Sequence, residues 1–286
     1  MTLRRLYPLH NRLATFTANA EAFAALALQR PVMTASDLRF VEHGDGYGHR
    51  AQAAIDIDGV IVHGHSKPAD SLFVVQHVYI GAIATLLGAP AASYMLVTDC
   101  RPHPGMEKYR EMDTVPRLFS ATPFDECETG SDFLRDIAFI NHVSHVFDIR
   151  GESISLGAAG QFRAFINDTN WLPPNVVRDR QSQQWCLIDP KYAALGKPAL
   201  LDHSNRDLIQ YGRVNLPNEA ERKRYDYGAN QMSARIFVLP DQTMDAVAES
   251  MQAHGLPAAH ELVARLKARR PIFNRTVVKK RFREFA

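Results

Sequence analysis

Strand-forming and helix-forming patterns are segregated along this chain of 286 residues, and the segregation limits the folds available to it. Residues 38–64 carry glycines among alternating apolar residues, which predicts two or three strands with tight turns. Asp58-Gly59 predicts a hairpin turn within them. Residues 70–88 have helical periodicity, residues 93–98 predict a short apolar strand, and the pattern is mainly helical from about residue 131. This order predicts an α+β fold.

Other segments complete this prediction. An alanine-rich stretch over 11–29 predicts a helix that Pro31 ends, and two further helices are expected near 217–233 and 241–270. Residues 101–130 are rich in proline, glycine and charge, which indicates a linker or a long exposed loop. The expected division of the chain therefore lies near residue 100.

Composition excludes several classes of protein. The chain has 33 Lys and Arg against 31 Asp and Glu, and 46% of its residues are hydrophobic, which is typical of a globular protein and not of a disordered one. Its apolar runs are too short for a membrane-spanning helix, so no membrane association is expected. Three widely spaced cysteines and the lack of an apolar leader favour a cytoplasmic location.

Positive charge is concentrated at the C-terminal end of the chain. Residues 265–286 carry nine Lys and Arg side chains and the single acidic residue Glu284. The simplest interpretation is a solvated basic helix face, and the alternative is a surface that contacts nucleic acid or an acidic protein partner. Nucleic-acid binding is expected only through this segment.

A predicted hairpin over residues 175–189 carries the chemistry that is easiest to interpret. Its first strand follows Asn175 and its second strand, Trp-Cys-Leu-Ile, ends at Asp189, so these two residues are expected side by side at one end of the hairpin. A carboxylate next to an amide carbonyl suits Mg²⁺, which prefers oxygen ligands and retains substrate phosphates in its coordination shell. The pattern therefore predicts a metal site at Asn175 and Asp189.

This arrangement resembles the kinase-like fold, in particular HipA-like kinases and aminoglycoside phosphotransferases. Those families have a metal-binding Asn before a hairpin and a metal-binding Asp about 14 residues later, positions that Asn175 and Asp189 match. The resemblance implies a bilobal protein, with a small strand-rich N-lobe over 1–100 and a larger, mainly helical C-lobe over 101–286. It also implies ATP and Mg²⁺ as ligands.

The resemblance extends weakly toward the N-terminus. The segment Tyr79–Pro90, followed by a strand, resembles the N-lobe helix of those families and its next strand. Gly44, Gly46 and Gly48 then correspond to a glycine-rich loop that covers the ATP phosphates.

Several expected charged residues are replaced. The catalytic Asp of the family corresponds to Asn170, whose amide can orient a hydroxyl group but cannot accept its proton. Asp168, two residues earlier, is the nearest substitute, so both are candidate catalytic residues.

The phosphate-pairing Lys and its helix partner also differ from the family. His63 occupies the strand position where the Lys is expected, and Lys67 follows several residues later. Gln76 and His77 stand where the helix should provide a Glu, and Asp70 is the nearest acid. We therefore expect either a divergent phosphotransferase or a pseudokinase that binds a partner protein.

A different enzyme class gives a competing hypothesis. The segment Ala-Ala-Ile-Asp-Ile-Asp-Gly-Val resembles the first motif of haloacid-dehalogenase-like phosphatases, with Asp56 as nucleophile and Asp58 as general acid. Further motifs would use Thr98, Lys197, Asp202 and Asp207. Lys197 and Asp202 are close together, whereas that family separates them by a helix and a strand, and a plain hairpin turn also explains Asp56–Gly59.

Overall fold

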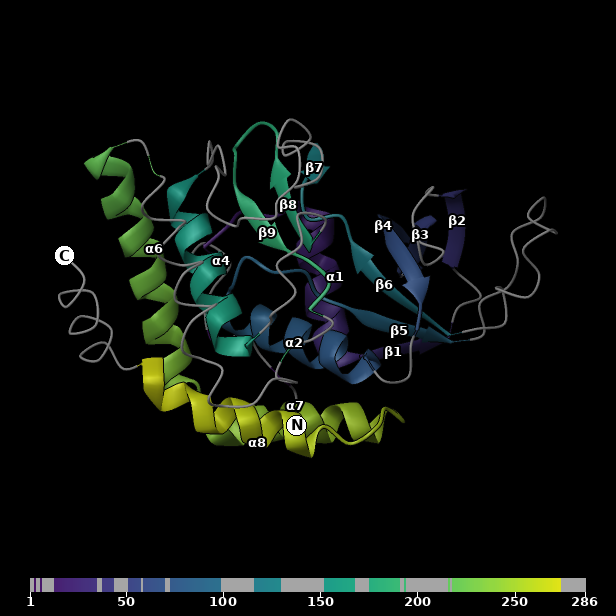
Figure 1. Cartoon of the computed structure of the whole chain (residues 1–286). Helices are drawn as coiled ribbons and strands as arrows, with labels where there is room; N and C mark the ends of the chain where they lie inside the picture. The colour runs from purple at the N-terminus through teal and green to yellow at the C-terminus, as the bar shows by residue number, and fades with distance from the viewer. Residues whose placement is uncertain are drawn as a thin grey trace, which may run out of the picture.

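The computed structural model shows an α+β fold (Figure 1). It describes residues 3, 6, 13–34, 38–43, 51–57, 59–69, 73–98, 116–129, 152–167, 175–190, 193, 216 and 218–273. The strands are β1 (Val32–Thr34), β2 (Leu38–His43), β3 (Ala51–Ile57), β4 (Val60–Pro68), β5 (Met95–Thr98), β6 (Arg117–Ala121), β7 (Cys127–Thr129), β8 (Val176–Asp179) and β9 (Trp185–Leu187). The helices are α1 (Ala18–Gln29), α2 (Val74–Leu87), α4 (Ser153–Ile166), α6 (Glu219–Val238), α7 (Asp241–Ala253), α8 (His260–Arg269) and the 3-10 helix η5 (Arg270–Phe273).

A six-stranded sheet gathers the first strands in the order β1-β5-β6-β4-β3-β2. Strands β2, β3 and β4 form an antiparallel meander, β6 pairs with β4 and β5, and β1 pairs in parallel with β5. The predicted turn between β3 and β4 is confirmed, with Gly59 at a φ of 87° that L side chains rarely adopt. The Asp56 carboxylate accepts a hydrogen bond from the Gly59 N–H at 2.8 Å, which fixes this turn.

Strand β4 has one buried face and one accessible face. Val62, Gly64 and Ser66 are buried, whereas His63 and His65 between them are exposed. Helix α1 packs on the buried side of the sheet, where the rings of Phe23 and Phe119 meet edge to face with centroids 5.2 Å apart. The period of two along the strand therefore leaves polar side chains on the opposite face.

The linker predicted over 101–130 is wrong for the part of it that the structure describes. Strand β6 lies inside the six-stranded sheet, and β7 forms a second sheet with β8 and β9. The charge that suggested exposure is buried: the Arg117 side chain is 2% exposed and its Nε donates to Ser66 Oγ at 3.0 Å. Because β6 pairs with β4, the sheet continues beyond the expected division near residue 100.

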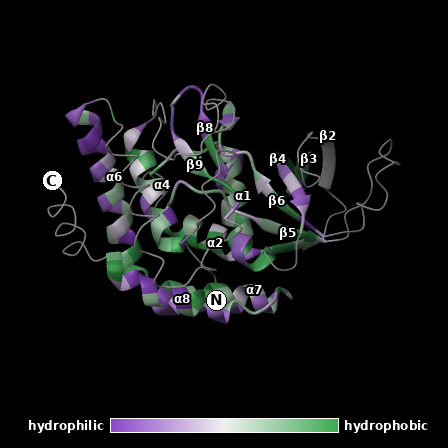
Figure 2. Cartoon of the chain, viewed as in Figure 1, coloured by the Kyte–Doolittle hydropathy of each residue, from purple (hydrophilic) through white to green (hydrophobic). Residues whose placement is uncertain are grey.

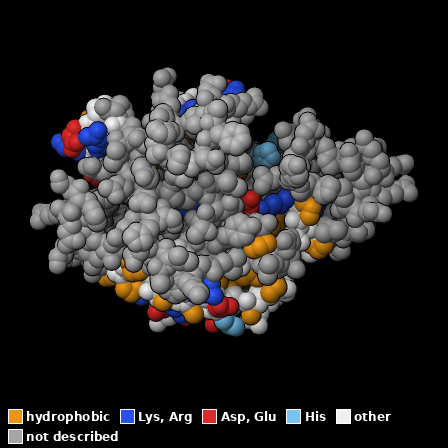
Figure 3. All heavy atoms as spheres, viewed as in Figure 1, with side chains coloured by type: hydrophobic (Ala, Val, Ile, Leu, Met, Phe, Trp, Pro, Cys, Tyr) orange, Lys and Arg blue, Asp and Glu red, His pale blue; other side chains and the backbone are white. Residues whose placement is uncertain are grey.

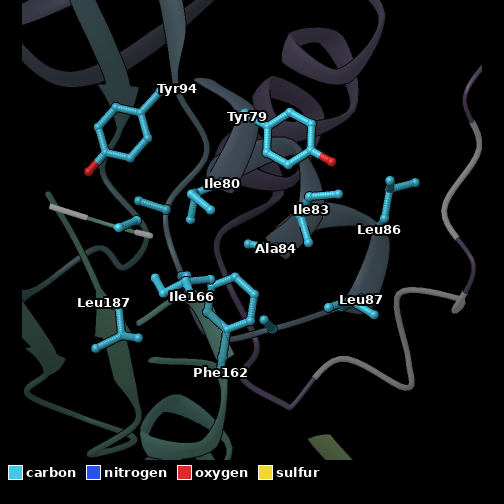
Figure 4. Close-up of a cluster of buried hydrophobic side chains, with 14 of the residues drawn as sticks. Tyr79, Ile80, Ile83, Ala84, Leu86, Leu87, Tyr94, Phe162, Ile166 and Leu187 are labelled. Carbon is cyan, nitrogen blue, oxygen red and sulfur yellow. The ribbon is translucent and has the colours of Figure 1, made fainter. Parts of the chain in front are cut away.

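Helix α2 runs through the centre of the molecule. The helix predicted over 70–88 is confirmed as Val74–Leu87, and it ends at Gly88, whose φ is 61°. Twelve of its residues are buried, so it is apolar on nearly every side (Figure 2). Its side chains lie next to Phe162 and Ile166 of α4 in a shared hydrophobic cluster (Figure 4).

The segment after α2 connects the six-stranded sheet to the smaller sheet. Leu187 of β9 donates its N–H to the Pro90 carbonyl at 2.9 Å, and Ala92 donates to the Leu187 carbonyl at the same distance. This parallel contact brings the end of β9 against the segment that leads into β5. The two sheets therefore share one hydrophobic core.

The C-terminal helices pack around this core. The helices predicted near 217–233 and 241–270 are confirmed, except that the second is divided into α7 and α8 around Gly255, which has a φ of 84°. Helices α4 and α6 approach so closely at Gly228 that a Cβ atom there would lie only 1.9 Å from the Ile154 carbonyl oxygen. Among the described residues, none of the helices combines the length and apolarity that crossing a membrane requires.

Candidate functional site

Three ionisable side chains from distant parts of the sequence meet beside helix α2. Lys67 lies near the end of β4, His77 lies in the first turn of α2, and Asp189 follows β9. The Lys67 ammonium contacts Asp189 Oδ1 and lies 2.7 Å from His77 Nε2. His77 Nε2 lies 2.7 Å from the same Asp189 oxygen. We refer to Lys67, His77 and Asp189 as the Lys-His-Asp cluster.

The hydrogen bonds of His77 define the role of each ring nitrogen. Its Nδ1 lies 2.8 Å from the Phe73 carbonyl oxygen, and a carbonyl can only accept, so Nδ1 carries the proton. His77 Nε2 has two partners at 2.7 Å: the Lys67 ammonium, which can only donate, and Asp189 Oδ1, which accepts as a carboxylate. The ring is therefore held by a backbone acceptor at Nδ1 and by a donor and an acceptor at Nε2.

The backbone around Asp189 is held in an uncommon conformation. Its φ is 56°, in the left-handed region that costs most L residues about 1 kcal/mol. The Asp189 N–H donates to the Tyr94 hydroxyl oxygen at 2.7 Å, and the Tyr94 ring packs edge to face on His77 with centroids 5.0 Å apart. Tyr94 thus fixes both the Asp189 peptide and the His77 ring.

The pKa values of the cluster follow from burial and charge. Burial lowers the pKa of His77, and the Lys67 charge adds to this lowering against the opposing influence of Asp189. Burial alone would raise the pKa of Asp189, but its contacts with His77 and with the Lys67 ammonium outweigh burial and hold that pKa well below its usual value. The cluster at neutral pH is therefore an ammonium and a carboxylate beside a neutral ring.

The hairpin places Asn175 near this cluster. Val176 pairs with Leu187, and the Ile188 N–H donates to the Asn175 carbonyl oxygen at 2.9 Å, so Asn175 and Asp189 lie at the same end of the hairpin as expected. Asn175 is buried, with 3% of its surface exposed. The hairpin therefore brings an amide residue and a carboxylate to the same end of the β8–β9 pair.

The other predicted site residues are distributed differently. His63 is on the exposed face of β4, four residues before Lys67, and its carbonyl oxygen accepts from the Thr122 N–H at 3.0 Å. The glycine-rich loop and the candidate catalytic residues lie outside the described part of the chain. These are Gly44, Gly46, Gly48, Asp168 and Asn170.

Sequence reasoning did not include His77 and Tyr94 among the site residues. His77 could have been found from its position, because it stands where kinase-like proteins have the Glu that pairs with the strand Lys. In the structure, the first turn of α2 faces the end of β4, which carries Lys67. Tyr94 carried no signal, since a tyrosine before an apolar strand is usual in a protein core.

The residues of the phosphatase hypothesis do not gather in the described region. Asp56 fixes the β3–β4 turn, and Thr98 Oγ1 donates to the Met33 carbonyl at 3.4 Å. Strand β3, which carries Asp56, is paired in antiparallel fashion on both sides. The other residues of that hypothesis, Asp58, Lys197, Asp202 and Asp207, lie outside the described ranges.

The described part of the basic C-terminal segment makes internal contacts. Lys267 pairs with Asp245 at 2.5 Å, and Arg270 pairs with Asp241 at 2.9 Å. Arg265 pairs with Glu261, and the buried Arg269 donates to the Phe165 carbonyl at 2.8 Å. Basic and acidic side chains accordingly lie close together at the bottom of the view, where α7 and α8 lie (Figure 3). The four basic residues up to Arg270 therefore serve the fold.

Comparisons of the sequence with protein-family models and with curated protein sequences found no match.

Proposed function

We propose that the chain is a kinase-like protein that binds Mg²⁺ and ATP at the Lys-His-Asp cluster. The observation that carries the proposal is the meeting of Lys67 and Asp189 across 122 positions of sequence. In protein kinases, a strand Lys binds the phosphates and an Asp that follows a later hairpin binds the metal. Binding of Mg²⁺ and ATP requires an ammonium group for the phosphates and a carboxylate for the metal, and Lys67 and Asp189 would supply them.

The position of Lys67 in the fold supports the same interpretation. Lys67 lies on the third strand of the β2-β3-β4 meander, and helix α2 follows that strand directly. Protein kinases carry the phosphate-binding Lys on the third strand and its ion-pair partner on the next helix. In this chain, His77 occupies the place of that partner, with Nε2 2.7 Å from the Lys67 ammonium.

The donor groups are suited to the proposed ligands. Asp189 offers a carboxylate that its neighbours keep ionised, and Asn175 lies at the same end of the hairpin, so this pair would hold Mg²⁺. Lys67 would bind the phosphate oxygens, and the loop that contains Gly44, Gly46 and Gly48 would cover them. Bound Mg²⁺ would neutralise phosphate charge.

The replacement of the helix acid by His77 changes the charge of the site. A Lys paired with a Glu is neutral as a pair, whereas Lys67 beside a neutral His77 keeps its full positive charge. Asp189 is then the carboxylate that competes with phosphate for Lys67 in the described cluster. This arrangement supports binding of a phosphate group, and phosphoryl transfer depends in addition on Asp168 or Asn170.

Thermal unfolding with and without Mg²⁺ and ATP tests the proposal. We expect Mg·ATP to raise the Tm of the unmodified chain, because a ligand that binds the folded state stabilises it. Asp189→Ala should abolish that rise, whereas Glu249→Gln, a change at an exposed residue of α7, should leave it intact. A Tm that Mg·ATP does not change in the unmodified chain would contradict nucleotide binding.

Labelled ATP distinguishes the two forms of the proposal. Incorporation of label into the protein, lost in Asp168→Asn, would identify a divergent phosphotransferase. Nucleotide binding without incorporation or hydrolysis would identify a pseudokinase, whose role would be to bind a partner protein.

A further inference from the structure

The accessible face of strand β4 carries a row of basic side chains that leads to Lys67. His63 and His65 are exposed on this face, and Lys67 continues the row because side chains two residues apart in a strand point to the same side. At about 3.3 Å per residue, His65 lies roughly 6.6 Å before Lys67 along the strand, and His63 roughly 13 Å before it. The row therefore extends the Lys-His-Asp cluster along the six-stranded sheet.

The surroundings of this row favour a ligand of negative charge. Neither β4 nor its neighbour β6 contains an acidic residue, and Ser120 of β6 lies directly opposite His65 in the register of the two strands. On β3, Asp56 is opposite Ile61 near the far end of β4, and its carboxylate accepts the Gly59 N–H. Hydroxyl and imidazole groups can both donate to phosphate oxygens, and β4 and β6 add no carboxylate that would repel them.

Asp189 limits the direction in which a chain of phosphate groups can leave Lys67. Its carboxylate contacts the Lys67 ammonium beside α2, the helix that follows β4. A phosphate group on that side of Lys67 is repelled by Asp189 unless a cation lies between them. Further phosphate groups of the same ligand are therefore repelled least when they extend back along β4 toward His65.

We propose that His65 and Ser120 form a second phosphate subsite, so that the phosphate chain of the ligand runs along β4 from Lys67 to His65. The inference deepens the proposed function and rests on it in one respect, because both use Lys67 as the first phosphate-binding residue. The ligand class is a linear chain of two or three phosphate groups, free or attached to a nucleoside, since the Lys67 ammonium is directed at Asp189 and a single phosphate group there does not extend to His65. His63 lies beyond the end of such a chain.

Calorimetric titration of the full chain with orthophosphate, pyrophosphate and tripolyphosphate, without metal ions, tests the inference. We expect affinity to rise with chain length, and His65→Ala to weaken tripolyphosphate binding about tenfold while orthophosphate binding stays unchanged, because only the longer chain loses a hydrogen bond. Ser120→Ala should weaken tripolyphosphate binding by a smaller factor, and Lys67→Met should weaken the binding of all three. The matched controls are His63→Ala, farther along the same face, and His260→Ala, at an exposed position of α8, and both should leave tripolyphosphate affinity nearly unchanged.

The same titration with ATP distinguishes the two sources of a phosphate chain. Tighter binding of ATP than of tripolyphosphate would identify a nucleotide, and weaker binding would identify a free polyphosphate. The inference requires in both cases that His65→Ala weakens the binding.

These variants separate the inference from the proposed function. Equal tripolyphosphate affinity in His65→Ala and the unmodified chain would overturn the subsite, and so would an equal loss in His63→Ala, which would indicate a general electrostatic attraction. If the Tm of His65→Ala still rises with Mg·ATP after such a result, the proposed function stands without the subsite. If tripolyphosphate binding depends on Lys67 and His65 but Mg·ATP never changes the Tm, the subsite stands without the kinase-like function.

Discussion

Two clusters of buried ionic groups in this molecule are built in opposite ways. On the smaller sheet, Arg178 and Glu128 are direct partners in the β7–β8 register, with Nε 2.6 Å from Oε1. The Arg178 guanidinium also lies over Trp185, its partner in the β8–β9 register, at 5.8 Å from the ring centroid. This ion pair follows from strand pairing alone, as cross-strand pairs do.

The Lys-His-Asp cluster has no such local origin. Its members come from a strand, a helix and the segment after a hairpin, and Asp189 has a left-handed φ. Strand register does not produce the pairing of Lys67 with Asp189, and the Asp189 backbone has an uncommon conformation. Arrangements of this kind are found at functional sites. The contrast is the reason that we propose a stabilising role for the Arg178–Glu128 pair and a binding role for the Lys-His-Asp cluster.

The largest expected loss of stability comes from breaking the structural pair. Glu128→Ala leaves Arg178 with most of its charge buried, so we expect the free energy of unfolding to fall by about 3 kcal/mol. Glu126→Ala, at an exposed position of the same segment, should change it by less than about 0.5 kcal/mol. Urea unfolding measures both, and a loss of the Mg·ATP response in folded Glu128→Ala would contradict the division of roles.

Removing the Lys67 charge from the Lys-His-Asp cluster should lower stability less than Glu128→Ala does, but it should abolish the proposed nucleotide binding. In Lys67→Met, His77 can take a proton and supply the positive charge beside Asp189, so we expect a loss of about 1–2 kcal/mol at neutral pH and no Mg·ATP-induced rise in Tm. The pKa of His77 should rise, because the Lys67 charge that lowers it is removed. Histidine NMR titration measures that pKa, and an unchanged or lower value would show that His77 does not replace the charge of Lys67.

The pH dependence of stability gives a smaller effect with a defined sign. Because the pKa of His77 is lowered in the folded chain, the unfolded chain binds a proton more readily, and stability falls as the pH decreases below about 6.5. The loss from this one group is at most about 1.4 kcal/mol per pH unit. His77→Gln should flatten the decrease between pH 7 and 5.5 in urea unfolding, and Lys67→Met should make it shallower. An equally steep decrease in all three proteins would assign it to other groups.

The smallest effect is expected at Tyr94. Tyr94→Phe removes the hydroxyl that accepts the Asp189 N–H, so we expect a loss of about 1 kcal/mol in the free energy of unfolding. Tyr227→Phe is the control, because Tyr227 is 55% exposed on α6 and the loss of its hydroxyl group should leave the free energy of unfolding unchanged. A Tyr94→Phe protein as stable as the control would show that Asp189 keeps its conformation without this hydrogen bond.

Periodic patterns in the sequence were sufficient for most of the elements. The α+β class, the turn at Gly59, helix α2 and the hairpin between Asn175 and Asp189 were all predictable, because each depends on residues that are close in sequence. Strand β6 was missed, since its proline-rich and charged surroundings resemble a loop and the burial of Arg117 depends on Ser66 of another strand.

The candidate site divides in the same way. The sequence by itself determined that Asp189 comes at the end of a hairpin and that His77 lies in a helix, because local periodicity sets both positions. The strands that it predicted over 38–64 stopped short of Lys67, which the structure places in β4. Only the tertiary structure decided that the three meet, since the distance between Lys67 and Asp189 depends on β6 pairing with β4 and on Pro90 pairing with Leu187. Contacts of this kind are fixed by the packing of the whole core around α2, which no single segment of the sequence encodes.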